Sequence, residues 1–254
     1  MTHDDIGQRL AQIAEEAGRL ILPLWSAGVE VSRKADDSPV TEADRRAERL
    51  ILDRLEAAFP GVPVVSEEDA SEFGTPEAIG PRFFLVDPLD GTKAFVRKDP
   101  NFTVNIALVE EGRPVAGAVV APASGETWFT RGAGAAKIAT PGAEPRAIEV
   151  RSGGDDPLVL ISHTMKLQDL AELKSRYRFE RTQAMDSSIK LVRIAEGAAD
   201  LYPRHGPTME WDIAAGHAVL RAAGGRLTGL DGEPFVYGKA DEGFRNGWFV
   251  ARGG

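Results

Sequence analysis

The chain has 254 residues, of which 43% are hydrophobic, and it carries a formal net charge of -9 and no cysteine. This composition supports a sizeable core, arranged either as one large domain or as two small ones. The absence of cysteine excludes disulfides, thiolate metal sites and a cysteine nucleophile, and it permits a reducing compartment. The negative charge argues against a nucleic-acid polymer as partner, because such binding needs a basic surface.

No stretch of the sequence approaches the roughly 18 consecutive apolar residues of a membrane span. The N-terminus opens with the polar run 2–5 rather than with a basic segment before an apolar one. We therefore expect no transmembrane segment and no secretory signal, and we expect a cytoplasmic protein. Peripheral association with the inner face of the cytoplasmic membrane and a homodimer are both left open.

The first part of the chain predicts two amphipathic helices. Apolar residues recur at helical spacing over residues 6–24, and Pro23 is expected to end this helix. A polar loop with Ser38 follows. Thr41 and Asp44 then have the spacing of a capping box for a second helix, which Pro60 is expected to end.

Strands are predicted next. Residues 62–65 and 83–86 are short apolar runs that suit buried strands, and both runs end in carboxylates. Three further strands are separated by short Gly-containing turns and predict an antiparallel meander over residues 102–109, 115–121 and 127–131. The Gly- and Ala-rich segment 132–142 is expected to be a loop.

The second half of the chain alternates predicted strands and helices. Strands are expected at residues 158–162 and 200–202, and helices at residues 167–177, 187–196 and 211–223, before Gly-rich turns and short strands to residue 250. Helices and mostly antiparallel strands thus interleave, which predicts a layered α/β fold. We expect one unit of two lobes, about 1–145 and about 146–254, with the seam near 135–155.

The strongest chemical signal is a predicted buried strand that runs into the segment Asp87-Pro88-Leu89-Asp90-Gly91-Thr92. Burying ionised carboxylates is costly unless cations pair with them. Pro88 disfavours a helical conformation at Asp87, so we expect the chain to turn and both acids to face one point. Hard cations such as magnesium prefer all-oxygen sites of this kind. An ordinary acidic turn of the Asx type is the alternative.

The residues that follow this acidic pair suit a phosphate ligand. Gly91 lets backbone approach a ligand closely, and the amides of Gly91 and Thr92 could open onto a phosphate.

Two further acids could converge on the same site. Glu67 follows a short predicted strand, and Asp212 stands at a predicted helix start. Each has a structural alternative, a solvated strand end for Glu67 and a favourable helix N-terminal charge for Asp212. Asp44 has an equally good alternative, since it occupies the return position of the Thr41 capping box.

Four ordered motifs carry a resemblance to a known family: residues 40–44 (VTEAD), 66–69 (SEED), 87–93 (DPLDGTK) and 210–216 (EWDIAAG). From about Ser38 to the C-terminal turns, the sequence resembles the inositol monophosphatase superfamily. Within it, the sequence most resembles the 3'(2'),5'-bisphosphate nucleotidases of CysQ type, which convert adenosine 3',5'-bisphosphate to AMP and phosphate and so recycle a by-product of sulfate assimilation.

Three features favour the nucleotidases over the inositol phosphatases. Lys93 directly follows the Asp-Gly-Thr sequence, where inositol phosphatases usually have an uncharged residue. Residues 186–190 (DSSIK) resemble the Ser-Ser-x-Lys segment with which the nucleotidases meet their nucleotide, and residues 202–208 (YPRHGPT) continue the likeness. Without this resemblance, Lys190 and Arg204 would be read as solvated surface charges.

The resemblance implies a sugar-phosphatase fold of alternating α and β layers with the site between two lobes. It implies one magnesium ion on Glu67, Asp87 and the Leu89 carbonyl, and a second on Asp87, Asp90 and Asp212. Family members often hold a third magnesium loosely near Glu67, and lithium commonly inhibits them.

The same resemblance assigns the catalytic and substrate residues. Thr92, oriented by Asp44, would position and deprotonate the attacking water. The implied substrate contacts are Glu67, Leu89, Asp90, Gly91, Thr92, Ser187, Ser188, Lys190, Arg204 and Asp212.

The sequence departs from the nucleotidase pattern at two places. Ala94 replaces the usual Glu after Lys93, and residues 163–165 (HTM) stand where the family has Arg-Ser-His. His163 either substitutes for that histidine or faces solvent, and His217 on a small-residue helix is expected to be packed without a catalytic role. An inositol or sugar phosphatase is the near alternative, and a metal- or nucleotide-binding regulatory protein without turnover is the distant one.

Overall fold

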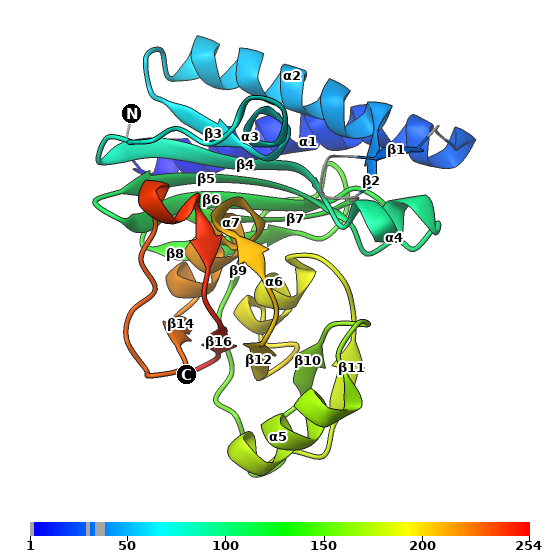
Figure 1. Ribbon diagram of the computed structural model, residues 1–254, viewed down its shortest axis with the longest axis vertical. Helices are drawn as coiled ribbons and strands as arrows, with labels where there is room; N and C mark the ends of the chain where they lie inside the picture. The colour runs from blue at the N-terminus through cyan, green and yellow to red at the C-terminus, as the bar shows by residue number, and fades with distance from the viewer. Residues whose placement is uncertain (1–2, 29–30, 34–38) are drawn as a thin grey trace.

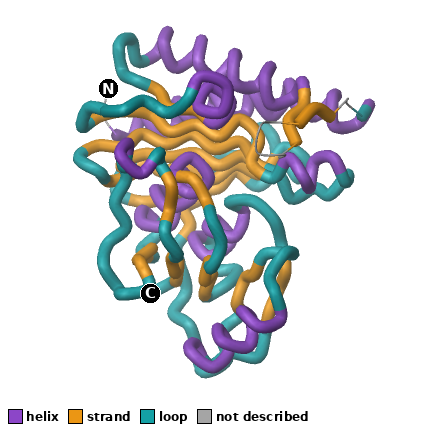
Figure 2. Tube along the Cα trace, viewed as in Figure 1, coloured by secondary structure: helices purple, strands orange, loops and turns teal. Residues whose placement is uncertain are grey.

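The computed structural model describes residues 3–28, 31–33 and 39–254, and it stacks helices and sheets in alternating layers (Figure 1). Helices α1 and α2 cover one face of a large sheet, and α6 and α7 cover the other (Figure 2). A smaller sheet follows, with α5 at the far end. The predicted layered α/β fold is confirmed, and the expected loop with Ser38 lies outside the described residues.

The first layer consists of α1 (His3–Ala27) and α2 (Glu42–Ala58). The predicted capping box of α2 is present, and the helix ends before Pro60 as expected. The prediction that Pro23 ends α1 is wrong, since the helix continues to Ala27. Pro23 is exposed there, and beyond it Leu24 and Trp25 still pack against the core, so burial holds the last turn in helical form despite the proline.

The large sheet has seven strands in the order β3-β4-β5-β6-β7-β8-β9, all antiparallel to their neighbours except the parallel pair β3 and β4. The predicted meander is confirmed as β5, β6 and β7. The strand bounds are β3 Val64–Ser66, β4 Arg82–Asp90, β5 Thr103–Glu110, β6 Arg113–Ala121, β7 Glu126–Arg131, β8 Gly134–Ile138 and β9 Arg146–Ile148.

The expectation of a loop over residues 132–142 is wrong, because β8 (Gly134–Ile138) pairs along β7. Successive side chains of a strand point to opposite faces, so Ala135 lies in the core beside α6 and α7, and Ala136 lies in the core beside α1 and α2. The small alanine side chains fit between the sheet and the helices on each side. The Gly- and Ala-rich composition of this segment is typical of a loop, so composition did not predict the strand.

The apolar run of β4 (Arg82–Asp90) is also buried on both faces of the sheet. Phe83 and Leu85 face one core, and Phe84 and Val86 face the other. Both faces of the sheet are covered by helices, so the strand reads as continuously hydrophobic rather than alternating.

The second half of the chain begins with the smaller sheet, ordered β11-β10-β12-β16-β14. The three predicted helices are confirmed within about two residues at each end. The bounds are α5 Leu167–Tyr177, α6 Ile189–Ala195, α7 Glu210–Ala222, β10 Val159–Ile161, β11 Thr182–Ala184, β12 Leu201–Arg204, β14 Arg226–Gly229 and β16 Phe249–Arg252.

Short elements complete the described chain. They are β1 Val31–Arg33, β2 Pro39–Thr41, α3 Glu67–Phe73, α4 Thr92–Val96, β13 Thr208–Met209, β15 Arg245–Asn246 and the 3-10 helix Ala240–Glu242. The division into two lobes near residue 145 stays a prediction. None of the helices in the described ranges has the length and apolar character needed to cross a bilayer.

Candidate active site

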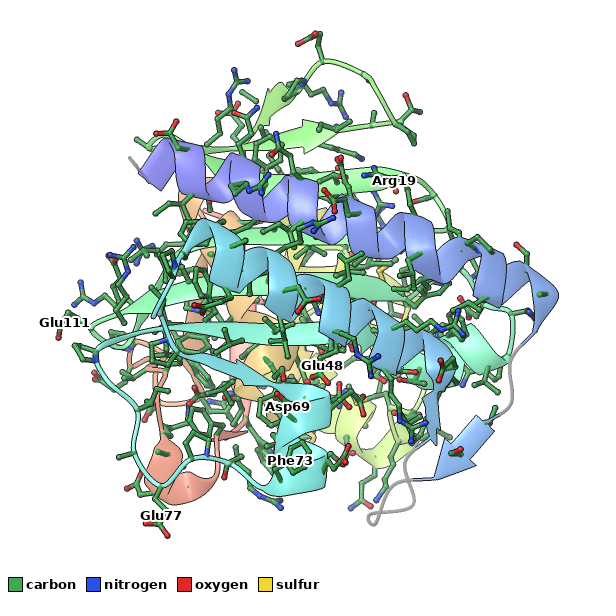
Figure 3. The ribbon with its side chains drawn as sticks, turned by 90° about the horizontal axis from the view of Figure 1, so that it is seen from above. Arg19, Glu48, Asp69, Phe73, Glu77 and Glu111 are labelled. Atoms are coloured by element: carbon green, nitrogen blue, oxygen red, sulfur yellow. The ribbon has the colours of Figure 1, made fainter. Side chains whose placement is uncertain are left out.

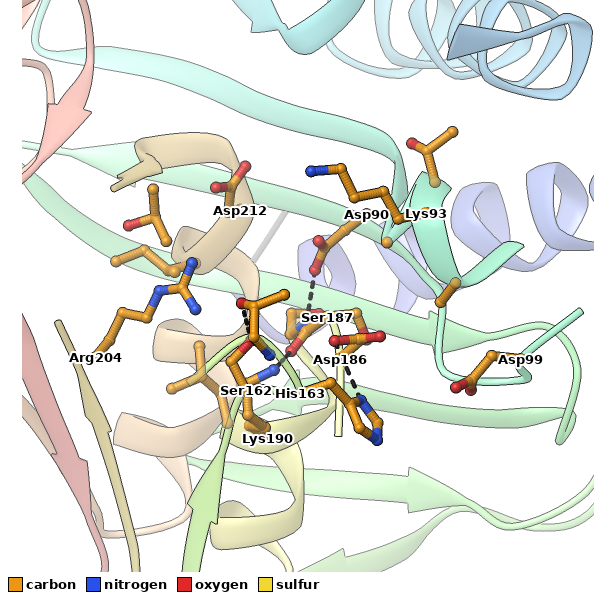
Figure 4. A pocket seen from close by; sticks show the side chains of 18 of the residues that line it. Asp90, Lys93, Asp99, Ser162, His163, Asp186, Ser187, Lys190, Arg204 and Asp212 are labelled. Atoms are coloured by element: carbon orange, nitrogen blue, oxygen red, sulfur yellow. Dashed lines mark hydrogen bonds and ion pairs between the residues drawn. The ribbon is translucent and has the colours of Figure 1, made fainter. Parts of the chain in front are cut away.

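A pocket of about 630 Å³ lies where β4, α3, α4, α6, β12 and α7 meet. Asp90, Arg204 and Asp212 point into the same space from three of these elements (Figure 4). Most of the residues predicted for the site line this pocket. They are Glu67, Asp90, Gly91, Thr92, Ser187, Ser188, Lys190, Arg204 and Asp212.

Asp87, Leu89 and Asp44 lie behind the pocket wall, each about 1% exposed. Strand β4 carries the first two, and its pairing with β5 shifts register between Asp87 and Asp90. The expected turn at Asp87 is therefore wrong, because the strand continues to Asp90 through an irregularity. Such a bulge re-aims side chains that would otherwise alternate. The Leu89 amide donates to Asp87 Oδ1 at 3.0 Å across it.

Four carboxylates gather at this end of β4. Burial, and then the negative charges of Glu67, Asp90 and Asp212, raise the pKa of Asp87 well above its ordinary value. Burial and the charges of Asp90 and Glu67 raise the pKa of Asp212 in the same way. Burial is the largest cause of both shifts, and repulsion among the carboxylates adds to it; a cation among them would relieve that repulsion. The oxygen-only donor set fits a hard divalent ion.

Asp90 sits in a more balanced environment. Burial raises its pKa to about 6, while Lys190 and the Ser188 amide oppose that rise. The Ser188 amide donates to Asp90 Oδ2 at 2.5 Å, so the start of α6 is tied directly to the acid cluster.

Two acids come from helix N-termini. Glu67 begins α3 (Glu67–Phe73), a helix that the sequence analysis did not predict, although the acidic first turn of residues 67–69 is a signal for one. Asp212 lies in the first turn of α7 and accepts the Met209 amide at 2.8 Å. Asp212 therefore caps its helix and lines the pocket at once.

Asp44 also combines two roles. One of its oxygens, Oδ2, accepts from the Thr41 amide at 2.7 Å and from the Thr41 hydroxyl at 2.6 Å, which completes the capping box of α2. The other oxygen, Oδ1, accepts from the Thr92 hydroxyl at 3.2 Å. Thr92 begins α4 directly after Gly91, which has a φ of 91°. A Cβ at Gly91 would lie 3.0 Å from the Asn101 carbonyl, so neighbouring backbone packs closely against this glycine, while the expected close approach to a ligand stays a prediction.

The basic residues lie on the opposite wall. The Lys190 ammonium donates to the carbonyls of Met185 at 3.0 Å and Ser187 at 2.7 Å, and it lies over the Tyr202 ring. Burial lowers its pKa to about 8. The Arg204 guanidinium donates to the Pro207 carbonyl at 3.3 Å, and its buried Nε has no hydrogen-bond partner among the residues that the structure describes.

Several residues around the site are not marked by any sequence motif. Thr103 and Asn105 on β5 each place a side-chain donor 3.4 Å from Asp90 Oδ2, and Asn105 also accepts from the Ser188 hydroxyl at 2.7 Å. No local signal marks them, because they reach the site through the register of β4 and β5.

The pocket has an outer end beside Asp186. Arg97 pairs with Asp186 at 2.8 Å, and His163 Nδ1 lies 3.3 Å from the other Asp186 oxygen. His163 is 42% exposed, and it lines the pocket without approaching the acid cluster (Figure 4). His217 is buried against the Tyr237 hydroxyl at 2.8 Å, as expected of a packed histidine.

Comparison with known proteins places this geometry in a family. The chain is 40% identical over 231 residues to the 3'(2'),5'-bisphosphate nucleotidase CysQ of Escherichia coli K12, covering 90% of this chain and 92% of that protein. It is 35% identical over 240 residues to the histidinol-phosphatase of Mycobacterium tuberculosis, covering 91% and 90%.

A solved structure agrees with these relatives. The crystal structure of CysQ from Bacteroides thetaiotaomicron, described as a bacterial member of the inositol monophosphatase family, matches with a TM-score of 0.79 and 32% identity over 98% of this chain and 97% of that one. The model of the inositol monophosphatase family matches residues 5–249. The chain therefore belongs to the inositol monophosphatase family.

Proposed function

We propose that the protein is a magnesium-dependent 3'(2'),5'-bisphosphate nucleotidase that hydrolyses adenosine 3',5'-bisphosphate to AMP and phosphate. One observation carries the proposal: three carboxylates that line the pocket, Glu67, Asp90 and Asp212, gather around the buried Asp87. Two basic side chains, Lys190 and Arg204, line the same pocket. A substrate with two phosphates needs both ends of such a pocket. The relatives named as nucleotidases support the choice of substrate.

Glu67, Asp87 and the Leu89 carbonyl would hold one magnesium ion, and Asp87, Asp90 and Asp212 a second. A third, loosely held ion near Glu67 belongs to the same proposal. When bound, the metals would supply charge stabilisation for the attacking and leaving oxygens of an in-line phosphoryl displacement.

The chain itself would orient and deprotonate the water. The Thr92 hydroxyl has two acceptors within reach of its one proton, Asp44 Oδ1 at 3.2 Å and the Leu89 carbonyl at 3.1 Å. When the proton is donated to Asp44, the Thr92 oxygen can accept a hydrogen bond from water. The two Thr41 contacts hold the Asp44 carboxylate in place as its charge changes. This pair would therefore act as the general base, and no covalent phosphoenzyme is needed.

The second phosphate would lie toward Arg204. Its guanidinium points into the pocket, and its Nε is a buried donor with no partner in the described part of the chain. Lys190 has two of its three donors occupied by backbone carbonyls, so one remains for substrate. Ser187 and Ser188 would contact the nucleotide at the same wall, and Glu67, Leu89, Asp90, Gly91, Thr92 and Asp212 would contact the phosphate that is removed.

The experiment that tests the proposal compares turnover of adenosine 3',5'-bisphosphate, inositol 1-phosphate and histidinol phosphate by the purified protein in magnesium. We expect the highest kcat/KM for the bisphosphate, no phosphate release in excess chelator and inhibition by lithium. A preference for inositol 1-phosphate or histidinol phosphate would reassign the substrate within the same chemistry. Binding of the bisphosphate without turnover would favour a regulatory protein.

The same proposal places the enzyme in the cytoplasm and includes recycling of the bisphosphate left by sulfate assimilation. A homodimer and a peripheral contact with the inner face of the cytoplasmic membrane stay predictions.

A further inference from the structure

We infer that Glu48 is a positioning residue for Glu67, which it holds in place by capping α3 from a different helix. The inference rests on the proposed function, which makes Glu67 a metal ligand. Glu48 belongs to none of the sequence motifs described above, and it does not line the pocket.

The first observation is the pair of hydrogen bonds made by one Glu48 oxygen. Oε1 accepts from the amide of Glu68 at 3.1 Å and from the amide of Asp69 at 3.2 Å. These are the second and third residues of α3, whose amides have no partner within their own helix. Figure 3 shows Glu48 on α2 close to Asp69 at the start of α3.

The second observation is that α3 has no cap of its own. Ser66 occupies the N-cap position, and its side chain makes no cap hydrogen bond. Residues at that position normally accept from the amides that Glu48 satisfies here. The helix has seven residues and buries only Glu68 among them, so its own packing holds it weakly. The contact from α2 therefore sets where α3 begins, and Glu67 is its first residue.

The third observation is that Glu48 lies one helical turn after Asp44. Residues four apart share a helix face, so α2 presents two buried carboxylates in the same direction. Asp44 contacts Thr92, and Glu48 contacts the start of α3. One rigid helix thus sets the position of the proposed water-activating pair and of a proposed metal ligand together. Partners behind metal ligands typically change metal affinity by about 10- to 100-fold when they are removed.

The test compares Glu48→Met with Glu48→Gln. Methionine retains the volume and removes the acceptor oxygen, whereas glutamine retains an oxygen that can accept both amides. Glu56→Ala, an exposed change on the same helix, is the matched control. Two quantities are measured without substrate: magnesium affinity by titration calorimetry, and hydrogen exchange of the segment 67–73 in metal-free protein.

In Glu48→Met we expect magnesium affinity to fall by about tenfold or more and the amides of Glu68 and Asp69 to exchange at least about tenfold faster. Glu48→Gln and Glu56→Ala should match the unchanged protein in both quantities. Steady-state measurements should show a higher half-saturating magnesium concentration in Glu48→Met, with kcat largely recovered at saturation.

Unchanged magnesium affinity in folded Glu48→Met would overturn the inference, and so would an equal loss in Glu48→Gln. If the methionine variant does not fold, Glu48→Asp carries the same comparison, since its carboxylate is drawn back by one methylene. If the unchanged protein binds no magnesium, the proposed function fails and the inference falls with it. A failure confined to the Glu48 variants leaves the proposed function intact.

Discussion

The Thr92 hydroxyl donates a 3.2 Å hydrogen bond to Asp44 Oδ1, although 48 residues separate the two in sequence. The other Asp44 oxygen is occupied by Thr41. The two oxygens of one carboxylate thus serve different partners, one structural and one in the pocket wall. This division makes the capping role and the proposed catalytic role separable by experiment.

Asp44→Asn tests that separation. An amide can keep its oxygen toward Thr41 and retain the cap, but it then presents a donor to Thr92 and cannot take up a proton. We expect the unfolding temperature to change little and kcat to fall by about 100-fold or more. Thermal unfolding and steady-state kinetics, measured on the same preparation, would separate the capping role of Asp44 from its catalytic role. Normal turnover in a folded variant would mean that Asp44 only caps α2 and has no catalytic role.

Asp87→Asn tests the metal assignment. Asp87 is proposed to hold two ions, and in the metal-free protein its charge is repelled by Glu67, Asp90 and Asp212. The variant should therefore lose nearly all turnover, while its metal-free unfolding temperature stays equal or rises. Magnesium should raise the unfolding temperature of the unchanged protein and not that of the variant. Near-normal turnover at saturating magnesium would contradict the assignment.

Arg204→Ala and Lys190→Ala test substrate choice. A charge-assisted hydrogen bond to a second phosphate is worth roughly 1.5 to 3 kcal/mol, so we expect kcat/KM for adenosine 3',5'-bisphosphate to fall by at least about tenfold in each variant. The single phosphate monoester 3'-AMP should be much less affected. Lys190 also donates to the backbone carbonyls of Met185 and Ser187, so its removal affects the local fold as well as substrate binding. We therefore expect the larger difference between the two substrates in Arg204→Ala. Equal losses on both substrates would assign the residue to the common phosphate site or to the fold.

Glu126 predicts a pH dependence of stability. Burial favours its neutral form, but hydrogen bonds from Arg193 at 2.7 Å and Lys137 at 2.5 Å outweigh this and lower its pKa from 4.5 to about 2. A folded pKa below the unfolded one adds stability that is complete above about pH 4.5 and is lost as pH falls toward 2.

Glu126→Gln removes this titration. The free energy of unfolding of the variant should lie below that of the unchanged protein by a constant amount near neutral pH. The gap should narrow below pH 4.5, with a slope of at most about 1.4 kcal/mol per pH unit. Urea unfolding at a series of pH values measures it. If the difference in free energy of unfolding between the two proteins did not depend on pH, the ion pairs of Glu126 would not couple its protonation to stability.

Gly117 tests how closely the layers pack. A Cβ at Gly117 on β6 would lie 2.8 Å from the Ala215 carbonyl and 2.9 Å from the Ala218 Cβ on α7. We expect Gly117→Ala to lower the free energy of unfolding by about 1 to 3 kcal/mol. Gly80→Ala, which has open space around it, is the control. Equal stability of the two variants would show that α7 can move away from the sheet at little cost.

Some of this protein could be predicted from the sequence by itself, because local spacing has a local physical cause. The Thr41–Asp44 capping box is confirmed because both of its bonds span three residues or fewer. The buried strand ending in Asp87 and Asp90 was predictable because a run of apolar residues followed by acids needs only its own chain. The four motifs were also enough to predict the family, because residue types and their order along the chain can be read without the tertiary structure.

The tertiary structure decided the rest, because the partners lie far apart in the chain. No periodicity predicts that Glu48 would cap α3 from 20 residues away, or that the Ser188 amide would bind Asp90 from 98 residues away. The strand β8 formed where composition predicted a loop, because the space between two layers accepts Ala135 and Ala136. Whether Lys190 faces backbone carbonyls or solvent was likewise set by burial, which depends on how the layers pack and which no local pattern encodes.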